Sequence, residues 1–189
     1  MKKGLLIIYS GPSGVGKGTV LKELMVKKGL NLVYSVSMTT RKPRQGEVEG
    51  KNYFFVTHEE FEKAIAKDEF LEYAEFVGNY YGTPKSFVES ERLKGNNVIL
   101  EIEVEGAKQV MKKCDDAMSI FIVPPSLEEL ENRIRNRKTE DEKTIAKRLA
   151  KARIEINETE LYDYVVCNDS VIDAVKEIEK IILDNMNNA

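Results

Sequence analysis

The chain has 189 residues, of which 42% are hydrophobic and 32% are charged, and its formal net charge at pH 7 is -3. This length and balance indicate an ordinary soluble globular protein with one buried core, and they leave little room for a second large domain. The slight acidity excludes a broad basic surface for nucleic acid, so any bound anion must be held by a local group of cations.

Short apolar runs alternate with amphipathic segments along the chain. In chain order the pattern predicts strands at 4–9, 32–36, 70–76, 98–104, 119–123 and 163–167. It predicts helices after the glycine-rich segment 11–18 and at 59–67, 87–94, 127–137, 143–160 and 171–186. Residues 42–51, 78–82 and 138–142 are predicted as a loop, a turn and a polar break. Alternating strands and helices predict an α/β fold with a parallel sheet core flanked by helices on both faces.

The strongest local signal is the glycine-rich segment 11–19 (GPSGVGKGT), which lies between a buried strand and a helix. Glycines let successive backbone N–H groups point into one concavity, and the start of a helix adds positive potential there. Lys17 supplies a mobile cation for the β- and γ-phosphates of a nucleotide. The segment therefore predicts a phosphate-binding loop made of Gly11, Pro12, Ser13, Gly14, Val15, Gly16, Lys17, Gly18 and Thr19.

The residue after the lysine departs from the usual pattern of such loops. That position is normally Ser or Thr, whose hydroxyl helps to hold Mg²⁺. Here it is Gly18, and the hydroxyl comes one residue later, at Thr19. GTPases, motor ATPases and small-molecule kinases share this loop, but the chain lacks an Asn-Lys-x-Asp guanine motif and is too small for a motor with an output domain.

Cations from several segments are candidates for holding phosphates. Phosphoryl transfer asks the protein mainly for positioning and for charge stabilisation, so cations must converge on the reacting groups. Arg41 and Arg44 lie in the loop after the second predicted strand. Arg133 and Arg137 are four residues apart on one predicted helix face, and Arg148 lies on the next helix, beyond the polar break.

The strand predicted at 98–104 ends in acids. Glu101 and Glu103 are two residues apart, which predicts that both lie on one face of that strand. Acids at the carboxyl end of a strand, beside a phosphate loop, suit a hydrated Mg²⁺ ion or a base that is rich in donors. The competing interpretation is a solvated strand edge.

Other residues limit the remaining chemistry. The single histidine, His58, makes a multi-histidine metal site impossible, and Thr57 with Glu60 predicts a capping box that places it at the surface start of a helix. Cys114 and Cys167 lack metal-ligand spacing, and we expect both to be reduced. No run approaches the length of a signal segment or a membrane span, so we expect a cytoplasmic protein with no membrane contact.

Several segments together resemble the guanylate kinases, which are P-loop nucleoside monophosphate kinases. They are 35–47 (SVSMTTRKPRQGE), 50–56 (GKNYFFV), 78–83 (GNYYGT), 121–126 (FIVPPS) and 166–169 (VCND). The segments follow one another in the order of the family, and the resemblance extends over nearly the whole chain. The resemblance implies one domain in three parts: a core at about 1–34, 85–126 and 162–189, a small GMP-binding region at about 35–84 and a helical lid at about 127–161.

The resemblance also implies a reaction and a set of roles. The reaction is MgATP + GMP ⇌ ADP + GDP, with Mg²⁺ held through ATP phosphates and water, and with Thr19 and Glu101 as candidate ligands. Glu101 is implied to lie near the water shell of Mg²⁺ or near the GMP ribose, among the GMP-binding residues. The residues implied to contact GMP are Ser37, Glu72, Thr83 and Glu103 at the guanine, and Arg41, Arg44, Tyr53 and Tyr81 at the phosphate, with Glu47 in the same signature. Those implied to clamp the transferring group are Lys17, Arg137 and Arg148, with Arg133 nearby and Asn168 near the ATP base and ribose.

The chemistry of guanine agrees with these roles. Guanine presents N1–H and N2–H₂ donors and carboxylates are acceptors only, so Glu72 would favour guanine over adenine. The family often has Asp at the positions of Glu101 and Glu103, and often Gln at Glu105. A kinase for another nucleoside monophosphate, such as AMP, is the first alternative. A guanylate-kinase-like binding module without catalysis is the second. The sequence leaves open whether the protein is a monomer or a homodimer.

Overall fold

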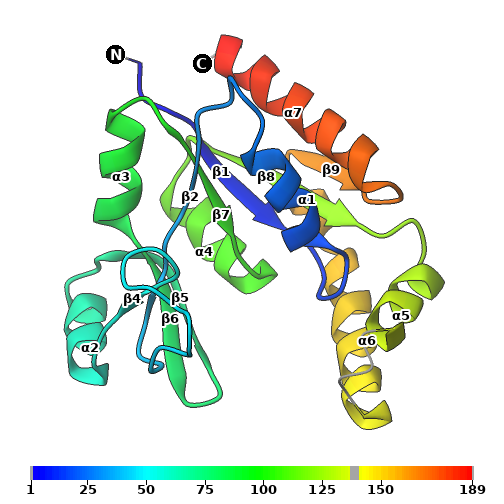
Figure 1. Cartoon of the computed structure of the whole chain (residues 1–189), viewed down its shortest axis with the longest axis horizontal. Coiled ribbons are helices and arrows are strands. Elements are labelled where there is room, and N and C mark those ends of the chain that lie inside the picture. Colours follow the sequence, from blue (N-terminus) through cyan, green and yellow to red (C-terminus); the bar gives the residue numbers. More distant parts are fainter. Residues whose placement is uncertain (1, 137–140, 189) are drawn as a thin grey trace.

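The structure, a computed structural model, describes residues 2–136 and 141–188. Its larger sheet has five parallel strands in the order β2-β7-β1-β8-β9 (Figure 1). The strands are β1 (Leu6–Ser10), β2 (Leu32–Tyr34), β7 (Asn97–Glu101), β8 (Ala117–Val123) and β9 (Tyr164–Cys167). The parallel sheet that the sequence predicts is thus confirmed.

Helices cover both faces of this sheet, because its central strands are apolar on both sides. On one face, Ile7 and Ile120 belong to a buried cluster with α1 (Lys17–Met25) and α7 (Val171–Asn188). On the other face, Ile8 and Phe121 pack with α3 (Lys85–Leu93) and α4 (Val104–Lys113). Every residue of β1 is buried, as expected of a central parallel strand between two helical layers.

A smaller sheet of four strands, in the order β4-β3-β6-β5, projects from the core. Its strands are β3 (Met38–Thr39), β4 (Phe54–Phe55), β5 (Phe70–Phe76) and β6 (Asn79–Pro84), and α2 (His58–Ala66) packs on it. The ring of Phe61 on α2 stacks between Phe70, at 4.4 Å, and Tyr80, at 5.2 Å between ring centroids. The predicted capping box of Thr57 and Glu60 starts α2 and is confirmed.

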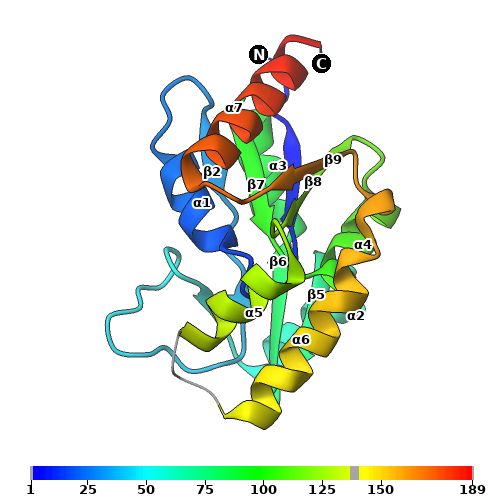
Figure 2. The ribbon, with the colours of Figure 1, turned by 90° about the vertical axis from the view of Figure 1, so that its right-hand side faces the viewer.

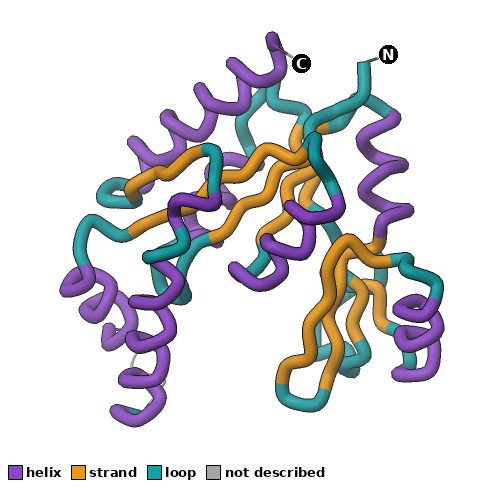
Figure 3. The backbone as a smooth tube through the Cα atoms, turned by 180° about the vertical axis from the view of Figure 1, so that it is seen from behind, coloured by secondary structure: helices purple, strands orange, loops and turns teal. Residues whose placement is uncertain are grey.

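A pair of helices, α5 (Leu127–Asn136) and α6 (Glu142–Ile156), lies on the opposite side of the molecule from the smaller sheet (Figures 1 and 2). Leu130 and Ile134 of α5 and Ile145 and Ala152 of α6 join the main buried cluster, so the pair is packed onto the core. Seen from behind, both chain ends lie at the far end of the main sheet, away from the smaller sheet and from this helical pair (Figure 3).

The structure corrects three of the predicted elements. The strand predicted at 98–104 ends at Glu101, and helix α4, which the prediction lacked, begins at Val104. Glu103 is the N-cap of α4, so it does not share a strand face with Glu101. The segment 78–82 is mostly strand β6, because the chain reverses at Val77 and Gly78, both with positive φ. The helix predicted at 143–160 ends at Ile156.

Candidate active site

The phosphate loop connects β1 to α1 and closes tightly on the core. Gly16 is the N-cap of α1 in the left-handed conformation, and no side chain caps the first turn. The N–H of Thr19 already donates to the backbone oxygen of Gly16 at 3.1 Å, so the N–H groups that precede it are the ones left for an anion. A Cβ atom at Gly16 would lie 2.7 Å from Nδ2 of Asn168, and one at Gly14 would lie 2.6 Å from Cγ1 of Ile134. Only glycine fits these two positions.

Lys17 lies half-buried within the loop. Its Nζ donates to the backbone oxygen of Gly11 at 2.5 Å and to that of Pro12 at 3.3 Å. Burial lowers the pKa of Lys17, and the nearby Glu101 carboxylate opposes that shift. The hydroxyl of Tyr9 donates to the backbone oxygen of Lys17 at 3.2 Å, which fixes the start of the helix. The lysine is thus positioned over the loop by strand β1 and by the loop's own carbonyl groups.

Two predicted ligand residues, Arg133 and Asn168, hold the loop from outside. Nδ2 of Asn168 donates to the backbone oxygen of Val15 at 2.8 Å. Nη1 of Arg133 donates to the same oxygen at 3.3 Å and to the backbone oxygen of Asn168 at 2.9 Å. These bonds join α5, the end of β9 and the phosphate loop. The side-chain oxygen of Asn168 is buried and has no hydrogen-bond partner within the described part of the chain.

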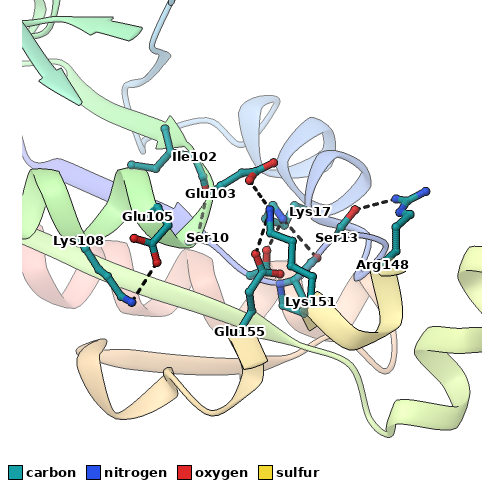
Figure 4. A network of polar contacts seen from close by, with 12 residues as sticks. Ser10, Ser13, Lys17, Ile102, Glu103, Glu105, Lys108, Arg148, Lys151 and Glu155 are labelled. Carbon is teal, nitrogen blue, oxygen red and sulfur yellow. Dashed lines mark hydrogen bonds and ion pairs between the residues drawn. The ribbon is translucent and has the colours of Figure 1, made fainter. Parts of the chain in front are cut away.

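Helix α6 brings cations to the phosphate loop and to the neighbouring acids (Figure 4). Nη2 of Arg148 donates to Oγ of Ser13 at 2.7 Å. One turn further along the helix, Nζ of Lys151 lies 2.7 Å from Oε2 of Glu103 and 3.5 Å from Oε1 of the buried Glu155. Arg137, the other cation predicted for this region, lies outside the described residues.

Two cavities meet at Glu101. One, of about 360 Å³, lies over the phosphate loop from Pro12 to Thr19, and Glu101 forms its wall. The other, also about 360 Å³, opens between the smaller sheet and the start of α4. Its lining residues are Tyr34, Ser37, Asn52, Tyr53, Glu72, Ala74, Glu75, Phe76, Tyr81, Glu101, Ile102, Glu103, Glu105 and Gly106. We call the second cavity the acceptor cleft.

Glu72 is a buried carboxylate in the wall of the acceptor cleft. Its side chain comes from β5, and the hydroxyl of Thr83 on β6 donates to its Oε1 at 2.5 Å. Its Oε2 lies against Gly106, where a Cβ atom would approach to 2.9 Å. Burial raises the pKa of Glu72, and the hydrogen bond from Thr83 partly offsets this shift. The structure thus brings together two of the four predicted guanine contacts, and Ser37 and Glu103 line the same cleft.

Arg41 is fixed by several partners at the edge of the acceptor cleft. Its Nη1 and Nη2 donate to the two carboxylate oxygens of Glu47, at 3.0 and 2.8 Å. The guanidinium carbon lies 5.4 Å from the ring centroid of Tyr53. The bond to Glu47 raises the pKa of Arg41, and a smaller contribution comes from the Tyr81 side chain. The backbone N–H of Arg44 donates to Oε2 of Glu47 at 2.7 Å, whereas the side chain of Arg44 is exposed.

Glu101 is half-buried at the carboxyl end of β7. Burial raises its pKa, and both the charge of Lys17 and the hydroxyl of Tyr34, 3.5 Å from its Oε2, oppose the shift. A Cβ atom at Gly18 would lie 3.9 Å from Oε1 of Glu101, so the absence of a side chain at Gly18 leaves space beside this carboxylate. The exposed Thr19 lines the same cavity over the phosphate loop.

The site thus combines a phosphate loop with a neighbouring cleft that contains a buried acid and has a fixed arginine at its edge. Comparison with known proteins shows which family has this combination. A family model described as guanylate kinase matches residues 3–185. The chain belongs to the guanylate kinase family. It is 60% identical over 182 residues to the guanylate kinase of Mycoplasma capricolum subsp. capricolum, which is 96% of this chain and 61% of that protein. It therefore spans less than two thirds of that relative's length.

Other members of the guanylate kinase family are closer in length. The guanylate kinase of Latilactobacillus sakei subsp. sakei is 55% identical over 180 residues, or 95% of this chain and 89% of that protein. The crystal structure of guanylate kinase from Anaplasma phagocytophilum superposes with a TM-score of 0.74 at 37% identity, covering 97% of this chain and 87% of that one. A shikimate kinase from Bacteroides thetaiotaomicron, at 12% identity and a TM-score of 0.50, shares the fold alone.

Some residues of this candidate site were given no role from the sequence. Tyr34, Asn52 and Glu105 line the acceptor cleft, and Lys151 and Glu155 connect α6 to its edge. Tyr34 ends a short strand and gave no motif signal. Lys151 and Glu155 are ordinary polar residues of an amphipathic helix, and only the packing of α6 places them beside Glu103.

Neither a cluster of metal ligands nor a membrane-spanning helix is found in the described part of the chain. Within residues 2–136 and 141–188, no three His, Cys, Asp or Glu side chains are grouped so that they could hold a metal ion. None of the helices described is both long and apolar enough to cross a membrane.

Proposed function

We propose that this chain is an ATP-dependent GMP kinase that transfers the γ-phosphoryl group of ATP to GMP. One observation carries the proposal: the cavity over the phosphate loop and the acceptor cleft share the wall formed by Glu101. Two nucleotides that bind in these cavities would have their phosphates face each other across one side chain. A transfer between phosphates needs this arrangement, and membership of the guanylate kinase family agrees with it.

The acceptor cleft is proposed to select guanine through its buried acid. Glu72 and Thr83 form a hydrogen-bonded pair, and the carboxylate can accept only from the N1–H and N2–H₂ groups of guanine. Adenine offers an acceptor at N1, which would leave the buried charge unpaired and cost more than a lost methylene would. Ser37 and Glu103 are proposed as further guanine contacts, since both line this cleft.

The acceptor phosphate is proposed to bind at Arg41, Arg44, Tyr53 and Tyr81. Arginine offers parallel N–H groups that match two phosphate oxygens, and tyrosine hydroxyls add donors without adding charge. The acceptor phosphate is itself a nucleophile, so we infer direct in-line transfer without a covalent intermediate and without a strong base. The protein's task is then to align the two phosphates and to lower their mutual repulsion.

The transferring group is proposed to be held between the phosphate loop and α6. Lys17 lies over the loop, and the bond from Arg148 to Ser13 shows how closely α6 approaches it. These two cations, with Arg137, would stabilise the charge that develops during transfer. Exclusion of water by the helical pair would also limit hydrolysis of ATP.

A divalent ion suits this site only as a partner of the nucleotide. Thr19 and Glu101 are the side chains in the cavity that could hold hydrated Mg²⁺, and Mg²⁺ commonly keeps several waters beside one or two carboxylates and the substrate phosphates. When bound, the ion would neutralise charge on the phosphate oxygens. The role of Glu101 is then to orient a water of that ion or a ribose hydroxyl.

The three-part organisation is also proposed rather than established. Residues 1–34, 85–126 and 162–189 would form the core, 35–84 the GMP-binding region and 127–161 the lid. The separate smaller sheet and the α5–α6 pair support these boundaries.

Transfer of label from [γ-³²P]ATP tests the proposed function directly. With GMP present, label should appear in GDP, and replacement of Lys17 by Met should abolish it. Release of labelled inorganic phosphate at the same rate with and without GMP would refute the transfer and leave only hydrolysis.

A further inference from the structure

The loop between β3 and β4 contains one acid with a distinctive set of bonds. Glu47 accepts from Nη2 of Arg41 at its Oε1, and from Nη1 of Arg41 and the backbone N–H of Arg44 at its Oε2. Its side chain is 19% exposed and that of Arg41 is 15% exposed, so the pair is largely shielded from water. A two-point contact of this kind fixes the plane of a guanidinium group as well as its position.

The bonds from Arg41 to Glu47 and to the backbone of Lys42 use only one side of its guanidinium. Both Nη1 hydrogens are used, one by Glu47 and one by the backbone oxygen of Lys42 at 2.8 Å. Nη2 gives one hydrogen to Glu47. The Nε–H and the second Nη2–H take no part in the bonds to Glu47 and Lys42, although the Tyr81 side chain also interacts with the guanidinium and helps to raise its pKa. These two N–H groups form a parallel pair of donors, which is the geometry that binds two oxygens of one phosphate.

Glu47 itself is unsuited to bind a phosphate. Both of its oxygens already accept hydrogen bonds, and the strong bonds from Arg41 and Arg44 lower its pKa to about 2, so it carries a negative charge at neutral pH. An ionised carboxylate has no hydrogen to donate and repels a phosphate dianion.

We propose that Glu47 is a positioning residue: it holds the Arg41 guanidinium with its Nε and Nη2 edge toward the acceptor phosphate and does not touch the nucleotide. This rests on the proposed function, since it takes the acceptor to carry a phosphate. The resemblance to the guanylate kinases implied that Glu47 binds GMP, whereas its bonds indicate that it acts through Arg41.

Positioning and simple electrostatics predict opposite signs when the acid is removed. Loss of a negative charge beside the phosphate would strengthen GMP binding if charge alone decided the affinity. Loss of the fixed guanidinium would weaken it, because a long side chain must then be ordered at the moment of binding. The sign of the change therefore distinguishes the two explanations.

The test is titration calorimetry of the full chain with GMP and, separately, with guanosine, which keeps the base and ribose but has no phosphate. We expect Glu47→Ala to weaken GMP binding by about tenfold, the order expected for ordering one long side chain. Guanosine binding should be unchanged. Glu47→Gln keeps one acceptor for Arg41 and should fall between Ala and the wild type. In turnover, the KM for GMP should rise more than kcat falls.

Glu49→Gln is the matched control. Glu49 is an exposed acid of the same loop whose carboxylate accepts from the backbone N–H of Phe55 at 3.0 Å, whereas the Arg41 guanidinium bonds to Glu47. It should leave GMP affinity within about twofold, as expected for a screened surface charge.

Each outcome decides the proposal. Weaker GMP binding with unchanged guanosine binding supports it. Tighter or unchanged GMP binding in Glu47→Ala overturns it, and so does equal weakening of guanosine, which would indicate general damage to the cleft. Wild-type protein that binds no GMP would overturn the proposed function and this proposal together, an outcome that the wild-type titration alone identifies.

Discussion

Replacement of Glu72 by Gln is expected to stabilise the protein without nucleotide and, at the same time, to weaken its selection of guanine. Glu72 is 7% exposed, and the hydroxyl of Thr83 donates a hydrogen bond to its carboxylate. Burial raises its pKa above the usual value of 4.5. The folded protein therefore binds the proton more tightly than the unfolded chain does, and stability is lost as the pH rises through the folded-state pKa.

The neutral amide avoids this loss. Gln keeps an acceptor oxygen for Thr83, so the change removes the buried charge while it preserves the hydrogen bond. We expect the free energy of unfolding of Glu72→Gln to exceed that of the wild type by about 1–2 kcal/mol at pH 8, the order of the cost of an unsatisfied buried polar group. At pH 4, where the wild-type carboxyl is protonated, the two proteins should be nearly equal.

The same change should alter the preferred acceptor. The carboxylate can accept from both N1–H and N2–H₂ of guanine, whereas the amide has one acceptor and turns a donor toward the other group. Loss of one hydrogen bond to a charged group costs about 1.5–3 kcal/mol, or about 10- to 150-fold in kcat/KM for GMP. The amide also matches N1 and N6–H₂ of adenine, so kcat/KM for AMP should rise.

Urea unfolding at pH 4 and pH 8, with GMP and AMP turnover, measures both effects. Glu69→Gln is the control, because Glu69 is an exposed acid just before β5 and loses the same charge. The reasoning is refuted if Glu72→Gln shows the wild-type dependence of stability on pH, or if its ratio of GMP to AMP turnover stays within about twofold of the wild type, since the lost bond should change it at least tenfold.

Three further predictions follow from the site. Arg148→Ala should lower kcat by about 10³–10⁵, the range for an essential arginine clamp, with little change in unfolding by urea; a loss below about tenfold would remove Arg148 from the transfer step. Lys151→Ala removes the cation 3.5 Å from the buried Glu155, a carboxyl whose pKa is already raised by burial. In urea titrations the free energy of unfolding of the variant should therefore fall further below that of the wild type as the pH rises from 5 to 8, and a difference independent of pH would contradict this. Gly16→Ala places alanine at a φ of +96°, with its Cβ atom against Asn168. The change should lower the free energy of unfolding by about 1–2 kcal/mol and weaken ATP binding measured by calorimetry; unchanged ATP affinity would show that the loop tolerates it.

The sequence predicted the main sheet and the phosphate loop because both are encoded locally. The run from Leu6 to Ser10 is buried throughout, and it is followed by Gly11, whose φ of +151° begins the turn into the phosphate loop. The helix at α2 was equally clear, since the capping pair Thr57 and Glu60 satisfies its first N–H groups. Such signals need no knowledge of the rest of the chain.

The smaller sheet was hidden because distant contacts define it. β3 and β4 have two residues each, too few for an alternating pattern. Residues 78–82 suggested a turn, but Gly82 packs under Phe61 and Phe70, where a Cβ atom would lie 2.9–3.0 Å from their rings. That glycine allows close packing against α2 and β5 rather than a turn.

The end of β7 shows a different limit. Apolar character continues through Ile102 to Val104, so the strand was extended to 104, although Glu103 starts a helix whose buried side is Val104, Ala107 and Val110. The sequence also did not predict which charged residues pair with one another. Nothing in the local pattern connects Lys151 to Glu103, 48 residues away, and the pairing of Glu47 with Arg41 needed the folded loop.

ADP release with MgATP, compared among GMP, AMP, CMP and UMP as acceptors, tests the central claim most directly. The buried pair of Glu72 and Thr83 in the acceptor cleft predicts rapid turnover with GMP and at most weak turnover with the other three. Rapid turnover with AMP in place of GMP would contradict the proposed acceptor cleft, and GMP binding without turnover of any acceptor would contradict the kinase itself.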